Sequence, residues 1–170
     1  MQFKRLAETG SGKNFIRLKD GESVVGVFRS DPHDFRVHWD HGQSIECVGA
    51  GCPQCKAGSK SAFRFRINFI TQENGAYVAK IFEQGKAVYM ALGALHSSGY
   101  DLTKTVVSIT RTGSGKNDTQ YNVLPLPPPK GIVTDAFEAK LQAIKLHDLA
   151  GSHDDSAEAN APADGDDIPF

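Results

Sequence analysis

Cysteine is scarce in this chain, and long hydrophobic runs are missing. The three cysteines are an odd number and lie together between Cys47 and Cys55, which argues against a disulfide framework and favours a metal site. No stretch approaches the roughly 18 apolar residues that a membrane-spanning helix requires, so we expect none. The start of the chain has no apolar stretch that could serve as a secretory signal, and we therefore expect an intracellular protein.

Motifs of common catalytic sites are also missing. There is no Gly-x-Ser-x-Gly elbow and no His-Glu-x-x-His pair, and the cysteines lack the His-x-Glu partner of a zinc deaminase. Thr-Gly-Ser-Gly-Lys-Asn occurs at residues 9–14 and 112–117, but neither copy has the first Gly or the final Ser or Thr of a phosphate-binding P-loop. We interpret both as basic, glycine-rich loops or plain loops, and we do not expect an enzyme.

Positive charge is missing from the end of the chain. Residues 151–170 contain six acids and no Lys or Arg, and we expect them to form a disordered tail. Residues 1–150 then hold all 19 Lys and Arg against 14 Asp and Glu, a net charge near +5. A basic domain over 1–150 followed by an acidic tail is typical of a nucleic-acid binder whose tail competes for the same surface.

The tail closes with the five residues Asp166, Asp167, Ile168, Pro169 and Phe170. The apolar side chains and the terminal carboxylate could dock into a basic-rimmed pocket on a partner. This tip closely resembles the acidic C-terminal tip of bacterial single-stranded DNA-binding proteins, in which it recruits replication and repair enzymes. The resemblance implies that these five residues are a partner-binding site; the alternative is an ordinary acidic tail.

Short strands dominate the rest of the chain. We expect strands at 23–29, 35–39, 62–71, 77–83, 87–90, 105–112 and 119–124, and helices at 91–98 and 134–150. This pattern fits a mainly β fold, an oligonucleotide-binding (OB) five-stranded barrel with an inserted zinc knuckle, one inserted helix and a C-terminal helix. Other small β-barrels and sandwiches fit the strand pattern equally well.

Residues 62–71 show the clearest alternation. The side chains of Phe63, Phe65, Ile67 and Phe69 are predicted to be buried, and those of Arg64, Arg66 and Asn68 to form a wet, basic face. Asn74-Gly75 predicts a tight hairpin turn to the next strand.

The cysteines follow the pattern Cys47-x4-Cys52-x2-Cys55, which supplies three of the four ligands that zinc prefers. His33, His38 and His41 are candidates for the fourth. We favour His38, because a strand can aim it at the Cys-Pro-Gln-Cys turn, over His41, which is beside Gly42 in an expected turn. A complete set would be a structural zinc site in a knuckle at about residues 38–60; the alternative is three reduced, free cysteines.

Two of these segments resemble phage proteins. Phage single-stranded DNA-binding proteins carry a His-Cys-Cys-Cys zinc site inside their binding domain, and this knuckle is similar in ligand type and placement, with shorter cysteine spacing. The segment from Ile109 to Tyr121 resembles a strand pair around a basic glycine loop in tailed-phage replication proteins. The resemblance implies an OB-fold protein of phage DNA replication, recombination and repair, located in the cytoplasm of the infected bacterial host.

Binding of single strands without sequence preference requires cations for phosphates and aromatic faces for bases. The residues expected to supply them are Trp39, Arg64, Arg66, Tyr77, Lys80, Tyr89, Arg111, Lys116 and Tyr121. For the arginines the alternative is surface solubility, and for the aromatic residues it is core packing. For the whole protein, the alternatives are a zinc-containing protein-interaction adaptor or, disfavoured because the body lacks an acidic metal-binding cluster, a DNA-processing nuclease.

Overall fold

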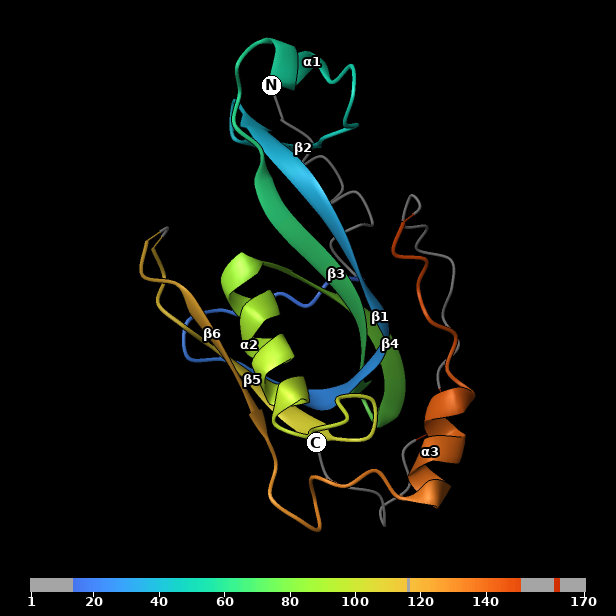
Figure 1. Cartoon of the computed structure of the whole chain (residues 1–170). Helices are drawn as coiled ribbons and strands as arrows, with labels where there is room; N and C mark the ends of the chain where they lie inside the picture. Colours follow the sequence, from blue (N-terminus) through green and yellow to red (C-terminus); the bar gives the residue numbers. More distant parts are fainter. Residues whose placement is uncertain (1–13, 116, 151–160, 163–170) are drawn as a thin grey trace, which may run out of the picture.

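The computed structural model describes residues 14–115, 117–150 and 161–162 (Figure 1). Strands dominate this part of the chain, as predicted, and helices are few. The elements are β1 (Ser23–Asp40), β2 (Gln43–Glu46), α1 (Pro53–Lys56), β3 (Ala62–Glu73), β4 (Ala76–Gly85), α2 (Lys86–Ser97), β5 (Val106–Thr112), β6 (Gln120–Pro125), α3 (Asp135–Gln142) and β7 (Ala161–Pro162). The named strands pair antiparallel in the order β6-β5-β1-β3-β4-β7, and β2 pairs with β1.

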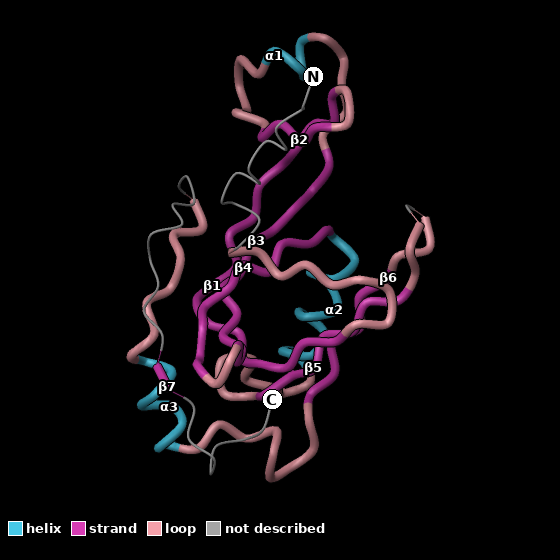
Figure 2. The backbone as a smooth tube through the Cα atoms, turned by 180° about the vertical axis from the view of Figure 1, so that it is seen from behind, coloured by secondary structure: helices cyan, strands magenta, loops and turns pink. Residues whose placement is uncertain are grey.

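The sheet is open between these named strands. Its strands curve round the lower part of the molecule, as Figure 2 shows, but no pairing between β4 and β6 closes a ring within the described residues. The mainly β class is therefore confirmed in a coarser form than the barrel that the sequence predicts. No helix in residues 14–115 and 117–150 combines the length and the apolar character needed to cross a bilayer.

Strand β1 is one continuous strand of 18 residues, so the prediction of two strands at 23–29 and 35–39 was wrong. The register against β3 shifts between Arg29 and His33, and Ser30 has a φ of 65°. Pro32, which has no N–H for a ladder bond, lies inside this irregularity, where a strand tolerates proline. The chain bends there instead of ending the strand.

Strands β3 and β4 form the predicted hairpin. Asn74 and Gly75 connect them with positive φ angles of 49° and 78°, the geometry that an Asn-Gly turn favours. One face of β3 is buried as expected, because Phe65 and Phe69 have no exposed surface. They pack with Phe28 and Phe82 in an aromatic core beneath α2.

The opposite face of β3 is wet over only part of its length. Arg64 and Arg66 are half-buried, but Asn68 is 1% exposed, so its predicted place on a wet face was wrong. The amide of Asn68 donates to the backbone carbonyl of His147 at 3.0 Å and accepts from the His147 backbone N–H at 2.9 Å. The chain after α3 therefore covers this end of the strand and satisfies its buried polar group.

Both predicted helices exist with different bounds. Helix α2 covers the expected strand at 87–90 as well as the helix at 91–98, because Val88 and Leu92, four residues apart, bury one helical face. Helix α3 begins after Thr134, whose hydroxyl accepts from the Phe137 N–H, and ends well before residue 150. It packs on a second core cluster that includes Tyr77.

Candidate metal centre and nucleic-acid interface

Four potential metal ligands meet at the tip of the long β1–β3 hairpin. Nε2 of His38 and the Sγ atoms of Cys47, Cys52 and Cys55 all lie within 4.8 Å of one another. Nε2 of His38 is 3.4 Å from Cys55 Sγ and 3.6 Å from Cys52 Sγ, and the Sγ atoms of Cys47 and Cys55 are 3.6 Å apart. A tetrahedron with metal–sulfur bonds of about 2.3 Å and metal–nitrogen bonds of about 2.0 Å has edges of roughly 3.5–3.8 Å. The cluster could therefore bind a metal ion.

The local sequence shapes this cluster as a tight turn. Gly49 and Gly51 have φ angles of 75° and 89°, which residues with a side chain rarely adopt. Pro53 begins the one-turn helix α1, and the N–H of Lys56 donates to the carbonyl of Cys52 at 3.1 Å. These features bring Cys52 and Cys55 onto one side of the turn.

The histidine that joins the cysteines is His38, as favoured from the sequence. It has no exposed surface, and its Nδ1 lies 3.2 Å from Ser59 Oγ. A metal on Nε2 would leave the proton on Nδ1, where it donates to Ser59 and fixes the ring. The other two candidates lie elsewhere: the His41 side chain is 93% exposed beside Asp40, and His33 stacks on Phe35.

The thiols of this cluster differ in acidity. The pKa of Cys52 is lowered to about 6, mainly by a hydrogen bond from the backbone N–H of Cys55. The pKa of Cys55 is raised to about 11, mainly by the hydrogen bond with the Cys47 side chain. A metal ion would replace the protons of the cluster with a positive charge and hold all the sulfurs as thiolates.

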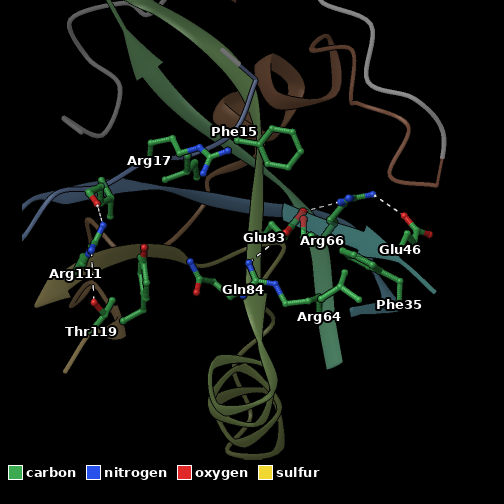
Figure 3. Close-up of a pocket in the computed structure, with 15 residues that line it drawn as sticks. Phe15, Arg17, Phe35, Glu46, Arg64, Arg66, Glu83, Gln84, Arg111 and Thr119 are labelled. Carbon is green, nitrogen blue, oxygen red and sulfur yellow. Dashed lines mark hydrogen bonds and ion pairs between the residues drawn. The ribbon is translucent and has the colours of Figure 1, made fainter. Parts of the chain in front are cut away.

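A polar groove of about 610 Å³ lies between the base of this hairpin and the β5–β6 hairpin (Figure 3). Its lining includes four arginines and three aromatic side chains, namely Arg17, Arg64, Arg66, Arg111, Phe15, Phe35 and Tyr121. Glu46 and Glu83 are the acids among its lining residues. The structure thus brings together Arg64, Arg66, Arg111 and Tyr121 of the expected DNA contacts.

Two of these arginines share one carboxylate. Arg64 Nη2 donates to Glu83 Oε1 at 3.2 Å, and Arg66 Nε donates to Glu83 Oε2 at 2.9 Å. The guanidinium of Arg66 also lies 4.2 Å from the centre of the Phe35 ring and 3.8 Å from a Glu46 oxygen. The face of β3 that we expected to be simply basic is therefore largely neutralised here.

The other two arginines have no such partner. Arg111 donates to the carbonyls of Leu18, at 2.6 Å, and Gly113, at 3.3 Å. Arg17 is exposed, with its guanidinium 5.8 Å from the Phe15 ring centre. Of the carboxylates in the described residues, none is within ion-pair distance of Arg17 or Arg111.

Three expected DNA contacts lie outside the groove. Tyr77 has no exposed surface and packs 5.3 Å from the Phe137 ring in the core, so its predicted role in base stacking was wrong. Lys80 forms an ion pair with Glu73 at 3.0 Å. Tyr89 lies on α2, where it packs against Phe63 and Phe65.

The remaining expected contacts divide between the exposed surface and the part of the chain that is not described. Trp39 is 59% exposed on the hairpin and does not line the groove. Lys116 and the tip residues Asp166, Asp167, Ile168, Pro169 and Phe170 lie outside the described residues.

The sequence reasoning missed one wall of the groove, the segment 14–18. Ile16 and Leu18 pack against the aromatic core, and Ile16 N–H donates to the Ile81 carbonyl at 2.9 Å. Phe15 and Arg17 alternate with them and line the groove. This alternation with period two was visible in the sequence and could have identified a short edge segment.

Comparisons of the chain with protein-family models, with curated proteins and with solved structures find no match.

Proposed function

We propose that this protein binds single-stranded DNA, without sequence preference, in the arginine-lined groove. The observation that carries the proposal is the combination of four arginines with Phe15, Phe35 and Tyr121 in one polar groove. Proteins that bind single strands combine these features, a positive channel for the backbone and aromatic faces for bases. Each stacked base would contribute about 1–3 kcal/mol.

The position of the groove in the fold supports the same function. Strands β1, β3 and β4, helix α2, and strands β5 and β6 follow one another, and β5 returns to pair with β1. We propose that this order is that of an OB-type barrel, in which the second and third strands and the loops L12 and L45 bind oligonucleotides. The groove lies on the corresponding strands, β3 and β4, beside the β1–β3 connection and the β5–β6 hairpin.

We propose zinc as the metal of the hairpin tip, in a structural role. Three thiolates and one imidazole are a ligand set that zinc prefers, and a full set of protein ligands leaves no position open for a catalytic water. His38, Cys47, Cys52 and Cys55 would hold the ion. The proposed activity is thus binding without catalysis.

The biological setting that we propose depends on the sequence resemblance. The protein would coat single strands during phage DNA replication, recombination and repair in the cytoplasm of the bacterial host. The tip from Asp166 to Phe170 would recruit replication and repair enzymes.

The test is a fluorescence-anisotropy titration of a labelled oligothymidine, beside a labelled duplex, at low and moderate salt. We expect tight binding of the single strand that weakens with salt, and little binding of the duplex. Equal or absent binding of both would contradict the proposal and favour a protein-interaction adaptor, for which the exposed Trp39 and Val48 offer a contact surface.

A further inference from the structure

We infer, on the basis of the proposed function, that the groove has one wall for phosphates and one for bases. Arg17 and Arg111 form the phosphate wall. The base wall consists of two cations and two anions in ion-pair contact, Arg64, Arg66, Glu83 and Glu46. Figure 3 shows Arg111 and Thr119 on one side of the groove and Arg66 with Phe35 on the other. Arg64 and Arg66 on β3 have acidic partners, whereas Arg17 and Arg111 have none among the described residues. The phosphate contacts are therefore assigned to Arg17 and Arg111 and not, as expected from the sequence, to β3.

The base wall has little net charge to offer a phosphate. The side chains of Arg64, Arg66 and Glu83 are only 30%, 16% and 22% exposed, so the carboxylate between the two guanidinium groups is poorly screened by solvent. A phosphate at this wall would meet the repulsion of Glu83 and would have to break its hydrogen bonds to both arginines. Binding there is therefore costly.

A nucleobase, in contrast, suits the base wall. Guanidinium groups are planar and stack on aromatic rings, as Arg66 already does on Phe35. A carboxylate can accept a hydrogen bond from an exocyclic amino group of a base. The neutral, polar and partly aromatic wall thus offers a base both stacking and hydrogen bonding without requiring negative charge.

The phosphate wall retains its positive charge. The partners of Arg111 are neutral oxygens, and its 2.6 Å bond to the Leu18 carbonyl holds the guanidinium beside segment 14–18. Arg17 belongs to that same segment and is exposed. Two uncompensated cations on neighbouring segments can contact successive phosphates of one DNA strand.

The experiment is the salt dependence of oligothymidine binding by the full-length protein and its variants. For single strands, each phosphate contact contributes about −0.7 to the slope of log K against log salt concentration. We expect Arg17→Gln and Arg111→Gln each to make the slope shallower by about 0.7. The charge-balanced double variant Arg64→Ala/Glu83→Gln, which leaves Arg66 paired with Glu46, should bind more weakly at every salt concentration with its slope unchanged.

Two further variants test the cause. Glu83→Gln should make the slope steeper by about 0.7 or more, because it leaves arginine charge uncompensated. Arg111→Lys should keep the wild-type slope because it keeps the positive charge, although it loses the hydrogen bonds of the guanidinium to the carbonyls of Leu18 and Gly113. Lys145→Gln is the matched control, an exposed cation that does not line the groove, and its slope should be unchanged. Arg17, whose side chain makes no hydrogen bond with the described residues, provides a variant without loss of fold.

The outcomes separate this inference from the proposed function. A wild-type protein that binds no single strand overturns both. Salt-sensitive binding by the wild type, with a slope that becomes shallower in the Arg64/Glu83 variant and not in the Arg17 and Arg111 variants, overturns only the assignment of the walls.

Discussion

The tip of the long hairpin and the rest of the molecule differ in what fills their interiors. The tip, residues 38–61 and here called the arm, has His38 and Cys52 as its buried side chains, and α1 has none. The remaining described residues, here called the body, have two clusters of aliphatic and aromatic side chains, with α2 packed on one and α3 on the other. The buried residues of the arm are potential metal ligands, whereas those of the body are mainly apolar.

This difference teaches which force holds each region. Burial of a large apolar side chain contributes about 1.5–3 kcal/mol, and the body has many such side chains. The arm buries too few to offset the entropy lost on ordering its chain. Its fold is therefore expected to depend on a metal ion, and that of the body is not.

The largest expected effect is loss of the arm on removal of the metal. The apparent binding free energy of a structural zinc ion is about 10–16 kcal/mol. Without the ion, this free energy would no longer stabilise the folded arm. We expect a strong chelator, or His38→Ala, to abolish the hydrogen-exchange protection of residues 38–61 while β4 and β5 remain protected. Exchange read by mass spectrometry measures this.

The control for this comparison is His41→Ala, which removes an exposed histidine from the same hairpin. It should leave both zinc content and protection unchanged. Loss of hydrogen-exchange protection throughout the body on chelation would contradict the comparison, because it would show that the body also depends on the metal ion.

The next effect is the reverse experiment, a cavity in the body. Phe69 has no exposed surface, and Phe69→Ala should lower the free energy of unfolding by about 3–5 kcal/mol. Chemical denaturation measures the change, with Leu124→Ala, a 64% exposed position, as the control that should change little. The folded variant should still bind zinc at the wild-type stoichiometry; a reduced zinc content would contradict the separation.

A smaller effect is expected for Trp39, the exposed aromatic side chain of the arm. If the arm contacts the bound DNA, Trp39→Ala should weaken single-stranded DNA binding by about 1–3 kcal/mol, the binding free energy contributed by one stacked base. Thermal stability should be unchanged, because the side chain is 59% exposed. Anisotropy and melting curves give the two values, and unchanged affinity would limit the arm to a structural role.

The smallest effect concerns the pH dependence of one ion pair of the body, Arg29–Glu138. Arg29 donates to both Glu138 oxygens, at 2.9 and 2.8 Å, and mainly this hydrogen bonding lowers the pKa of Glu138. The pair therefore stabilises the body above the unfolded pKa of about 4.3, and the contribution disappears as pH falls through the lower folded pKa.

The variant for this pair is Glu138→Gln. It should cost about 1 kcal/mol at neutral pH, and urea midpoints should show the cost shrinking as the solution becomes acidic. A cost that is the same at every pH would assign it to packing and not to charge.

The sequence predicts features that depend on near neighbours along the chain. The potential metal ligands of the arm are within a short segment, so spacing alone predicted Cys47, Cys52 and Cys55, and strand position predicted His38. The Asn74-Gly75 turn was equally local, and the structure confirms it.

The errors concern what covers a strand from elsewhere in the chain. Asn68 is buried because the backbone at His147 reaches it, and Tyr77 because Phe137 packs on it. No pattern within β3 or β4 records these distant contacts. Pairing of Arg64 and Arg66 with Glu83 likewise depends on the register of the neighbouring strand, which the alternation alone does not give.

Strand β1 runs without interruption from the body into the arm, and β3 begins where the arm ends; this continuity has a thermodynamic consequence. Ser44 and Glu46 of β2 contribute to the groove, so part of the groove exists only when the arm is ordered. If an ion binds at the tip and DNA binds in the groove, as we propose, both would favour the same conformation and their affinities would be linked. Such linkage is reciprocal: the factor by which the metal raises the affinity for single-stranded DNA equals the factor by which the DNA raises the affinity for the metal.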